Sequence, residues 1–324
     1  MYEKNIRLDN YDRKILFALD KNARISTTDV GKYLKKSKQF IDYRIKRLEE
    51  IGILSKYITL IDYSRLGYQS IRVYFKFHNL TREKQDEIED ELIKDKEVWW
   101  LVTLEGQWDV GFATAVKNVL DFYVYWEKIM SKYGKYISTR SVVIYSHIQQ
   151  YPKSYLINKI NTDKGTLVGA SKKIVSLNKR DMQILKLVSD HGRMPLLEIA
   201  SKLHTSPQVI RTHLRKMETD KLILGYIALI DVSFLGYRYY KLYLTLLNTE
   251  RIRELEQFCL QHPNILNVNR TIGGSDFEIE LQAKSFEEFD YIVNELRKVF
   301  AGMIDRYEFV IARKEKKMVY FPFE

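Results

Sequence analysis

The chain has 324 residues, of which 45% are hydrophobic, so it is long enough for two to four compact domains with buried cores. A formal net charge of +11 favours an anionic partner such as nucleic acid, and without a run of 18 apolar residues no transmembrane helix is expected. The single cysteine, Cys259, excludes an internal disulfide framework; with a charged N-terminus unlike a secretory signal, it predicts a cytoplasmic protein.

The first 52 residues predict three short helices. One helix covers residues 10–20, and a second follows the sequence STTD at 26–29, which is typical of a helix start. Ser37 caps a third helix, and its inward face at helical spacing is formed by Ile41, Ile45 and Leu48. Three short helices with a tight break before the third are typical of a helix-turn-helix, whose last helix enters the DNA major groove.

The outward face of this third helix is the first candidate DNA-binding surface. Gln39 can read adenine through two hydrogen bonds, and lysines on the same face can reach guanine or phosphate. The candidate DNA-binding residues are Lys38, Gln39, Asp42, Tyr43, Arg44, Lys46 and Arg47. Two of these, Arg44 and Arg47, are expected to hold phosphates or to pair with Glu49 and Glu50. For each residue taken singly, the alternative is a solvated helix face.

The next segment predicts a strand-rich domain. Residues 71–77 alternate between apolar and polar side chains, which indicates a half-buried strand. Further along, the patterns predict a helix at 82–95, strands at 98–104 and 109–116, a helix at 119–133 and a strand at 137–148. The order β-α-β-β-α-β is that of a ferredoxin-like domain.

The second half of the chain repeats the first after a polar segment at 157–176, which is expected to be a linker. The phrase IDYSRLGY at 61–68 returns as IDVSFLGY at 230–237, a shift of 169 residues. We therefore predict an α+β fold with two winged helix-turn-helix and two ferredoxin-like domains in tandem. The expected boundaries are 1–62, 63–156, 177–231 and 232–324, and the charged stretch at 313–317 is expected to be a solvated end.

The second predicted recognition helix follows Ser206 and keeps only one outward polar residue of the first, Gln208 in place of Gln39. Its candidate DNA-binding residues are Gln208, Arg211, Thr212 and Arg215. Because the two outward faces differ, we expect the two heads to read different half-sites, or one head to read sequence while the other grips phosphates.

The stretch from Leu8 to Leu54, followed by residues 61–68, resembles the Lrp/AsnC family of feast/famine transcription regulators, and the resemblance covers nearly the whole chain twice. It implies heads that bind double-stranded promoter DNA, and ferredoxin-like domains that pair across a dimer and bind a small effector, commonly an amino acid. The family's Gly-x-x-Asp turn implies effector-binding residues Gly106, Trp108 and Asp109. A second turn, one residue shorter unless Gly273 compensates, implies Gly274 and Asp276. A further departure is Lys221, which stands where the first copy has Gly52.

One chain with both modules predicts an intramolecular pseudo-dimer, association of two or more chains, and an imperfect palindrome as the DNA site. The six histidines show no metal-ligand spacing, and we expect no metal, no cofactor and no enzyme activity. The main alternative is a sirohaem decarboxylase-like enzyme of the same architecture, but residues 99–112 lack the His and Arg expected there, and the second copy offers only Arg270. A third interpretation is a chromatin protein with little sequence preference.

Overall fold

The computed structural model describes residues 8–321; the seven N-terminal and three C-terminal residues, which the predicted outer domains include, lie outside the described residues. The first head consists of α1 (Asn10–Lys21), α2 (Thr27–Leu34) and α3 (Lys38–Glu50). The second consists of α6 (Lys179–Val188), α7 (Leu196–Lys202) and α8 (Pro207–Thr219). As predicted, Ser37 and Ser206 cap the third helix of each head by accepting a backbone N–H of its first turn.

Each head is followed by the predicted β-α-β-β-α-β unit. The first unit contains β2 (Gln69–Phe77), α4 (Arg82–Lys94), β3 (Val98–Gly106), β4 (Val110–Val116), α5 (Val119–Tyr133) and β5 (Ile137–Gln150). The second contains β8 (Arg238–Leu246), α9 (Ile252–Gln261), β9 (Ile265–Ile272), β10 (Phe277–Ala283), α10 (Phe286–Val299) and β11 (Ile304–Met318). No helix in residues 8–321 has the length and apolar character needed to cross a membrane.

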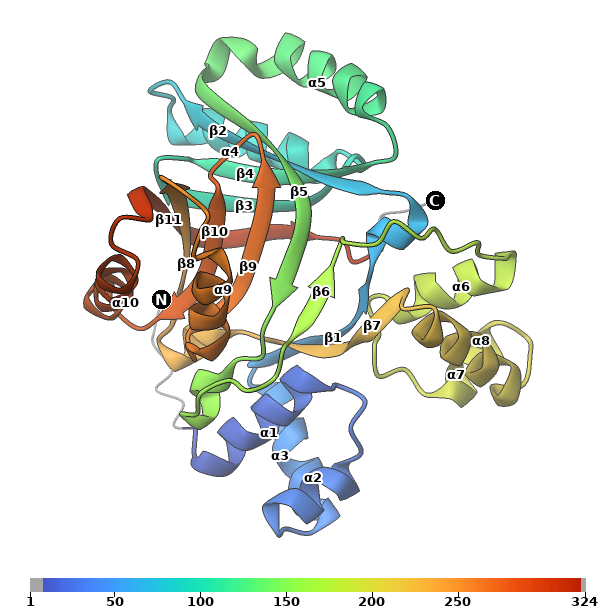
Figure 1. Cartoon of the computed structure of the whole chain (residues 1–324). Coiled ribbons are helices and arrows are strands. Elements are labelled where there is room, and N and C mark those ends of the chain that lie inside the picture. Colours follow the sequence, from blue (N-terminus) through green and yellow to red (C-terminus); the bar gives the residue numbers. More distant parts are fainter. Residues whose placement is uncertain (1–7, 322–324) are drawn as a thin grey trace.

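The two units close into one barrel (Figure 1). The strand order is β2-β4-β3-β11-β8-β10-β9-β5, and β5 pairs again with β2 to complete the ring. The joins between units are β3 with β11 and β5 with β9. Residues 313–317 are therefore not a free end: they belong to β11, where Glu315 pairs with Val102 of β3, although residues 313–315 are exposed as predicted.

Closure of the barrel buries both faces of strands that the sequence predicts to be half-buried. Ile71, Val73 and Phe75 of β2 pack against the outer helices, as their alternation predicts. On the other face, Arg72 is 8% exposed and Tyr74 is 1% exposed, because both point toward the opposite unit. The prediction of a half-buried strand was wrong in this respect, because the polar face of β2 faces the inside of the pseudo-dimer and not solvent.

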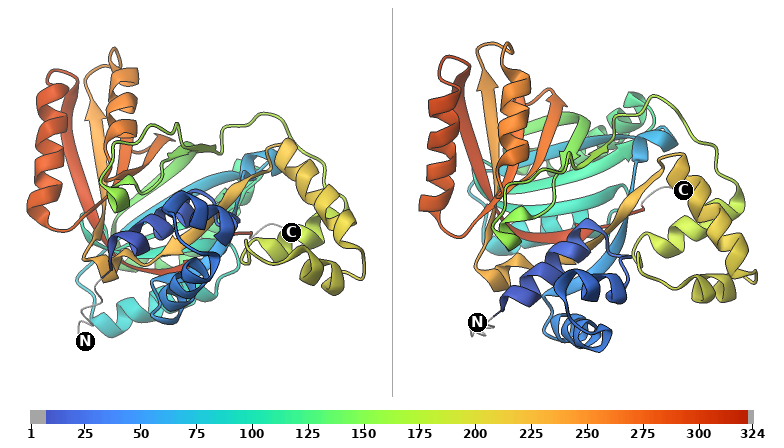
Figure 2. Two further views of the ribbon diagram at one scale, coloured as in Figure 1. Left: turned by 90° about the horizontal axis from the view of Figure 1, so that it is seen from below. Right: turned by 60° about the horizontal axis from the view of Figure 1, so that its bottom comes forward.

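A two-stranded ribbon connects the heads to the barrel. Strand β1 (Leu54–Ile61) runs antiparallel to β7 (Ile223–Ile230). Each strand of the ribbon also packs against the head of the other module: Ile61 of β1 lies in the core of the second head, and Ala228 of β7 lies in the core of the first. Figure 2 shows the heads near opposite ends of this ribbon. Each head is thus fixed by strands of both modules.

The segment predicted as a linker is docked along much of its length. A 3-10 turn at Ser154–Ile157 is followed by β6 (Thr166–Val168), which pairs with β5 at the end of the sheet. The backbone N–H of Gly169 donates to the Asp62 carboxylate, and Lys21 forms an ion pair with Asp163 at 2.8 Å. These contacts tether the connection to both the first head and the ribbon.

The substitution of Gly52 by Lys221 in the second copy imposes a left-handed backbone on a lysine. Gly52 has φ +85° and Lys221 has φ +58°, so the turn is the same in both heads. A side chain at such a position costs about 1 kcal/mol. We expect Lys221→Gly to raise the free energy of unfolding of the second head by about that amount in urea titrations, and Gly52→Lys to lower that of the first. A loss of stability in Lys221→Gly would contradict this account.

Candidate nucleic-acid interface and inter-module cavity

The predicted recognition face of α3 is exposed. Lys38, Gln39, Asp42, Tyr43 and Lys46 all lie on the solvent side, while Ile41, Ile45 and Leu48 are buried. Tyr43 is 65% exposed, an unusual position for a large aromatic ring on a helix without a partner surface. The exposed face is therefore free to contact another molecule.

Arg44 and Arg47 do not lie on that free face. Both donate through Nη1 to Asp12 of α1, at 3.0 Å and 3.2 Å, and Asp12 is fully buried. Arg44 also reaches Asp9 at 2.9 Å. The predicted pairing with Glu49 and Glu50 is wrong, because the helical turn that exposes Lys46 brings Arg44 and Arg47 against α1, where both pair with Asp12. Their contact with phosphates stays a prediction. Their role in the structure is to hold α3 on α1.

The second head builds the same brace with different residues. His213 Nδ1 lies 2.6 Å from the buried Asp181 carboxylate, and Lys216 Nζ lies 3.4 Å from it. Burial disfavours the charged form of Asp181, but hydrogen bonds from His213 and from the backbone of Asn178 outweigh that cost, so the pKa of Asp181 lies below its ordinary value of 3.8. The ionised carboxylate therefore stabilises the folded head.

Because the pKa of Asp181 is lowered by folding, its contribution is present above the unfolded value and is lost as pH falls through the folded value. We expect Asp181→Asn to cost about 1.5–3 kcal/mol at neutral pH, since it removes the charged acceptor of the hydrogen bonds from His213 and from the backbone of Asn178. Its remaining stability should vary less with pH below about 4 than that of the unmodified protein. Urea unfolding followed by circular dichroism at pH 7 and pH 3 measures both effects. The exposed Asp305→Asn is the control, and equal acid sensitivity in both variants would refute the role of Asp181.

The outer face of α8 carries the predicted set of the second head. Gln208, Arg211, Thr212 and Arg215 are exposed, whereas Ile210, Leu214 and Met217 form the inward face. Two contacts stay within the face: Arg211 lies 3.4 Å from the Gln208 side chain, and the Thr212 hydroxyl donates to the Gln208 carbonyl. This face is more strongly cationic than that of α3, which carries Asp42 between its lysines.

Matching contacts lock the two heads together across the ribbon. The Arg24 guanidinium lies 4.0 Å from the Tyr226 ring, and its counterpart Arg193 lies 4.9 Å from the Tyr57 ring. The Tyr57 hydroxyl donates to Glu49 near the end of α3, and the Tyr226 hydroxyl donates to Glu218 near the end of α8. Each recognition helix is therefore tied to the ribbon, so the heads have fixed positions relative to each other.

The structure corrects the assignment of the second Gly-x-x-Asp turn. Gly106 has φ +122°, and a Cβ there would lie 3.0 Å from the Phe309 carbonyl; Gly273 has φ +86°, and a Cβ there would lie 3.0 Å from the Val142 carbonyl. Gly273 is therefore the counterpart of Gly106, and Gly273–Asp276 is a turn of full length. The predicted Gly274 has no left-handed backbone and packs against Val143.

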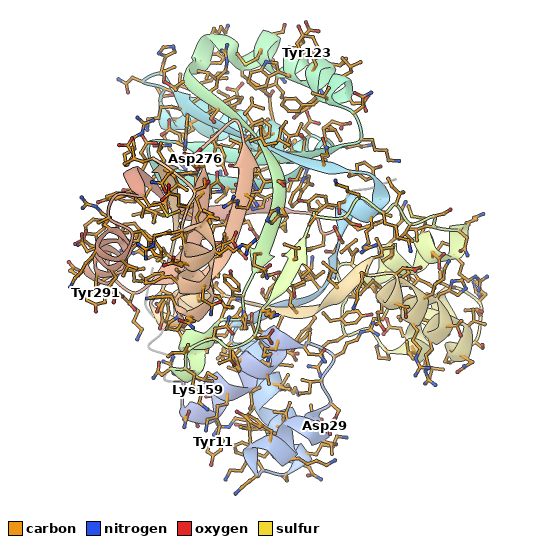
Figure 3. All side chains as sticks on the ribbon, viewed as in Figure 1. Tyr11, Asp29, Tyr123, Lys159, Asp276 and Tyr291 are labelled. Atoms are coloured by element: carbon orange, nitrogen blue, oxygen red, sulfur yellow. The ribbon has the colours of Figure 1, made fainter. Side chains whose placement is uncertain are left out.

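The two turn aspartates fasten strand ends. Asp109 accepts from the backbone N–H of Phe77 and pairs with Lys76, both at 2.8 Å, and Asp276 accepts from the N–H of Leu246 at 2.8 Å. Trp108 is 9% exposed and packs inside the barrel against Tyr74. Figure 3 places Asp276 far from the first head, where Tyr11 and Asp29 are labelled. The predicted effector residues are thus brought to the hairpin ends of the barrel, where both carboxylates already have partners.

Sequence reasoning missed a buried charge cluster inside the barrel. Lys241 Nζ lies 2.7 Å from Glu278 and 3.4 Å from Glu280, and it donates to the hydroxyls of Tyr74 and Tyr145. Arg72 donates to Glu280 at 3.2 Å. Burial opposes ionisation of Glu280, yet Lys241 and Arg72 hold its pKa well below the ordinary value. The cluster contains two cations and two carboxylates and is balanced in charge.

The cluster is asymmetric between the modules. Arg72 and Lys241 occupy corresponding positions of β2 and β8, but both carboxylates come from β10 of the second module. The corresponding strand of the first module, β4, carries Gly111 and Ala113. Pairing of two first modules would bury two cations alone, and pairing of two second modules would bury an excess of two carboxylates. Charge balance therefore favours the pairing of unlike modules.

A cavity of about 910 Å³ lies between the ribbon and the barrel. Apolar residues of β1 and β7 line one side, including Ile58, Ile61 and Ile227, and the tryptophans of β3, Trp99 and Trp100, line another. Arg72, Lys241 and Glu280 connect the cavity to the charge cluster. In the sequence, the polar side chains that alternate along β2 and β8 indicate this charged lining, but a solvated strand face explains the same alternation equally well.

Known proteins share this architecture in part or in full. The AsnC-type helix-turn-helix domain matches residues 8–49, and a winged helix-turn-helix DNA-binding domain matches residues 177–224. The chain is 30% identical over 138 residues to an uncharacterized HTH-type transcriptional regulator of Pyrococcus abyssi, which covers 42% of this chain and 92% of that protein. It is 23% identical over 148 residues to the HTH-type transcriptional regulator FL11 of Pyrococcus horikoshii, covering 46% of this chain and 97% of that one.

Among solved structures, the siroheme decarboxylase NirDL matches with a TM-score of 0.65 over 97% of this chain and 94% of that chain, at 14% identity. That likeness shows a shared two-module fold. Each of the two regulators corresponds in length to one module of this chain, whereas NirDL corresponds to both.

Proposed function

The chain belongs to the Lrp/AsnC family, with two modules in tandem, and from this premise we propose that it is a transcription regulator whose two heads bind one DNA duplex together. The supporting observation is the pair of exposed faces on α3 and α8, held in fixed positions by a ribbon that passes between both heads. Because Gln39 and Gln208 recur while their neighbours differ, the bound site is an imperfect palindrome.

The test is a mobility-shift assay on the DNA upstream of its own gene, repeated across a range of salt concentrations. Two heads that neutralise roughly 6–10 phosphates lose affinity steeply between low and physiological salt. Competition with random DNA separates a sequence-specific regulator from a chromatin protein. If no shift occurs even at low salt, or if random DNA competes equally well, the proposal of specific regulation fails.

We propose further that a small molecule modulates this binding and that whole chains associate. Supporting association, α5 exposes a group of apolar side chains near Tyr123, which is labelled in Figure 3. The exposed apolar residues of α5 are Val119, Leu120, Tyr123 and Val124, and they exceed what a free helix surface usually shows. Val124→Glu is expected to lower the molar mass measured by sedimentation. A monomeric unmodified chain would refute association.

A second candidate, siroheme decarboxylation, is favoured by the full-length match to NirDL and by the cavity of about 910 Å³ between the ribbon and the barrel. Against it, no histidine occurs among the described residues that line the cavity, and the turn at Gly106–Asp109 offers neither His nor Arg. Addition of siroheme to the protein distinguishes the two: a change in absorbance with loss of carboxyl groups would favour the enzyme.

A further inference from the structure

The cavity beneath the ribbon has polar atoms without partners on its wall. Tyr63 is 8% exposed and Ser70 is 2% exposed, and no described residue supplies a hydrogen-bond partner to either hydroxyl. The same holds, within residues 8–321, for Nε of Arg72 and Nε1 of Trp99. Buried polar groups normally have partners, so such a group of atoms on one cavity wall is unusual.

The chemistry of these atoms is one-sided. Arg72 Nε and Trp99 Nε1 can only donate, and the hydroxyls of Tyr63 and Ser70 can also donate. Among the described residues, the one unpartnered atom on the wall that can only accept is Oδ1 of Asn267. A ligand that satisfies this wall must therefore present acceptor oxygens, as an acid group does.

The rest of the wall is apolar and aromatic. Trp100 stacks with the Arg72 guanidinium at 4.6 Å, and Ile148 and Val168 add aliphatic surface. A volume of about 910 Å³ lies near the upper end of the roughly 300–1,000 Å³ of small-molecule pockets. Both features suit a flat apolar body larger than a free amino acid.

We propose that this cavity binds an amphipathic aromatic acid, with its acid group against Ser70, Arg72 and Trp99 and its apolar body under the ribbon. The site differs from the hairpin turns at Gly106 and Gly273, whose carboxylates are already occupied. Its role as an effector site rests on the proposed DNA-binding function. The ribbon couples this site to the heads. Ile61 and Ile227 of the ribbon line the cavity, and their strands enter the cores of the heads.

The test uses the fluorescent dye anilinonaphthalene sulfonate, an aromatic anion, with the full-length protein. The dye is expected to bind saturably, with one molecule per chain. Ala115 lies opposite Ser70 in the β2–β4 register and lines the cavity, so Ala115→Phe should abolish this binding. Trp99→Phe removes the Nε1 donor while keeping an aromatic ring and should weaken binding about tenfold, as expected for a hydrogen bond to a charged group. The matched control is Trp126→Phe, on α5, which should bind like the unmodified protein.

Absence of saturable binding to the unmodified protein, or unchanged binding to Ala115→Phe, overturns the assignment. Thermal melting checks that each variant is folded, and Trp99→Phe keeps the test decisive if Ala115→Phe does not fold. Titration of DNA with and without dye then tests the effector role, which fails if the bound dye leaves DNA affinity unchanged. Loss of DNA binding under all conditions, with dye binding intact, counts against the proposed function and leaves the cavity site standing.

Discussion

Replacing Arg211 and Arg215 together by glutamate is expected to weaken DNA binding at least about a hundredfold, because each contact from a recognition helix contributes about 1–3 kcal/mol. Both side chains lie on the exposed face of α8 and project from a helix that the brace of Asp181 holds in place. The slope of affinity against salt should also become shallower, since fewer counterions are released. Mobility-shift titrations at several salt concentrations measure both quantities.

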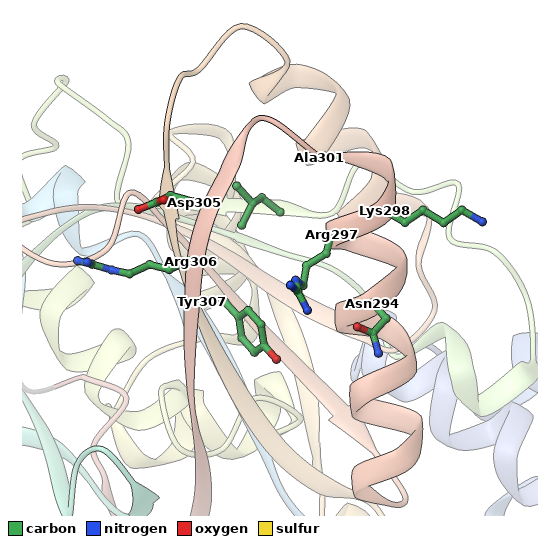
Figure 4. Close-up of a pocket in the computed structure, with 8 residues that line it drawn as sticks. Asn294, Arg297, Lys298, Ala301, Asp305, Arg306 and Tyr307 are labelled. Atoms are coloured by element: carbon green, nitrogen blue, oxygen red, sulfur yellow. The ribbon is translucent and has the colours of Figure 1, made fainter.

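The matched control changes the same charge far from the heads. Arg297 and Lys298 are exposed on α10 beside a groove lined by Asn294, Asp305 and Tyr307 (Figure 4). Figure 1 shows α10 on the opposite side of the molecule from α8. Arg297→Glu with Lys298→Glu alters the net charge equally, so it should reduce affinity only slightly. An equal loss in both double variants would indicate that overall charge, and not the α8 face, controls binding.

Lys241→Met is expected to lower the free energy of unfolding by about 3–5 kcal/mol, the effect of removing one partner from a buried ion pair. The substitution keeps the volume of the side chain but leaves Glu278 and Glu280 with an excess of buried negative charge across the two modules. Trp100 and Trp108 lie next to the cluster, so their fluorescence in urea titrations reports directly on opening of the barrel.

A surface ion pair provides the comparison for Lys241. Arg313 pairs with Glu105 across the β11–β3 join, but both side chains are more than half exposed, so Arg313→Ala should change stability by less than about 1 kcal/mol. Adding Glu278→Gln to Lys241→Met should restore part of the lost stability, because it removes one uncompensated charge. If Lys241→Met is as stable as the unmodified protein, the cluster does not hold the modules together.

The sequence was sufficient for the elements and their order because those depend on local pattern. Residues 119–133 were predicted as a helix with the bounds the structure has. The inward face of α3 also followed from spacing alone, and with it the exposure of Gln39 and Lys46. Periodicity fixes which side of a helix faces its own core.

What the sequence could not supply were contacts between elements far apart along the chain, above all those between modules. Arg72 and Tyr74 look like the solvent side of an alternating strand, since nothing local indicates that a second sheet covers them. The stretch at 313–317 looks like a charged tail, yet strand pairing with β3 decides its structure. Arg44 and Arg47 share the same limitation, because their partner Asp12 lies on another helix. In each case the deciding contact joins residues far apart along the chain.

Hydroxyl-radical footprinting on the bound promoter DNA tests most directly whether both heads of one chain engage one duplex. Two protected segments are expected, separated by whole helical turns of about 10–10.5 base pairs. At protein concentrations raised enough to offset the lost affinity, Arg211→Glu with Arg215→Glu should remove one segment, and Gln39→Ala with Lys46→Glu should weaken the other. A single protected segment, or loss of both segments together in either variant, would contradict simultaneous engagement by two distinct heads.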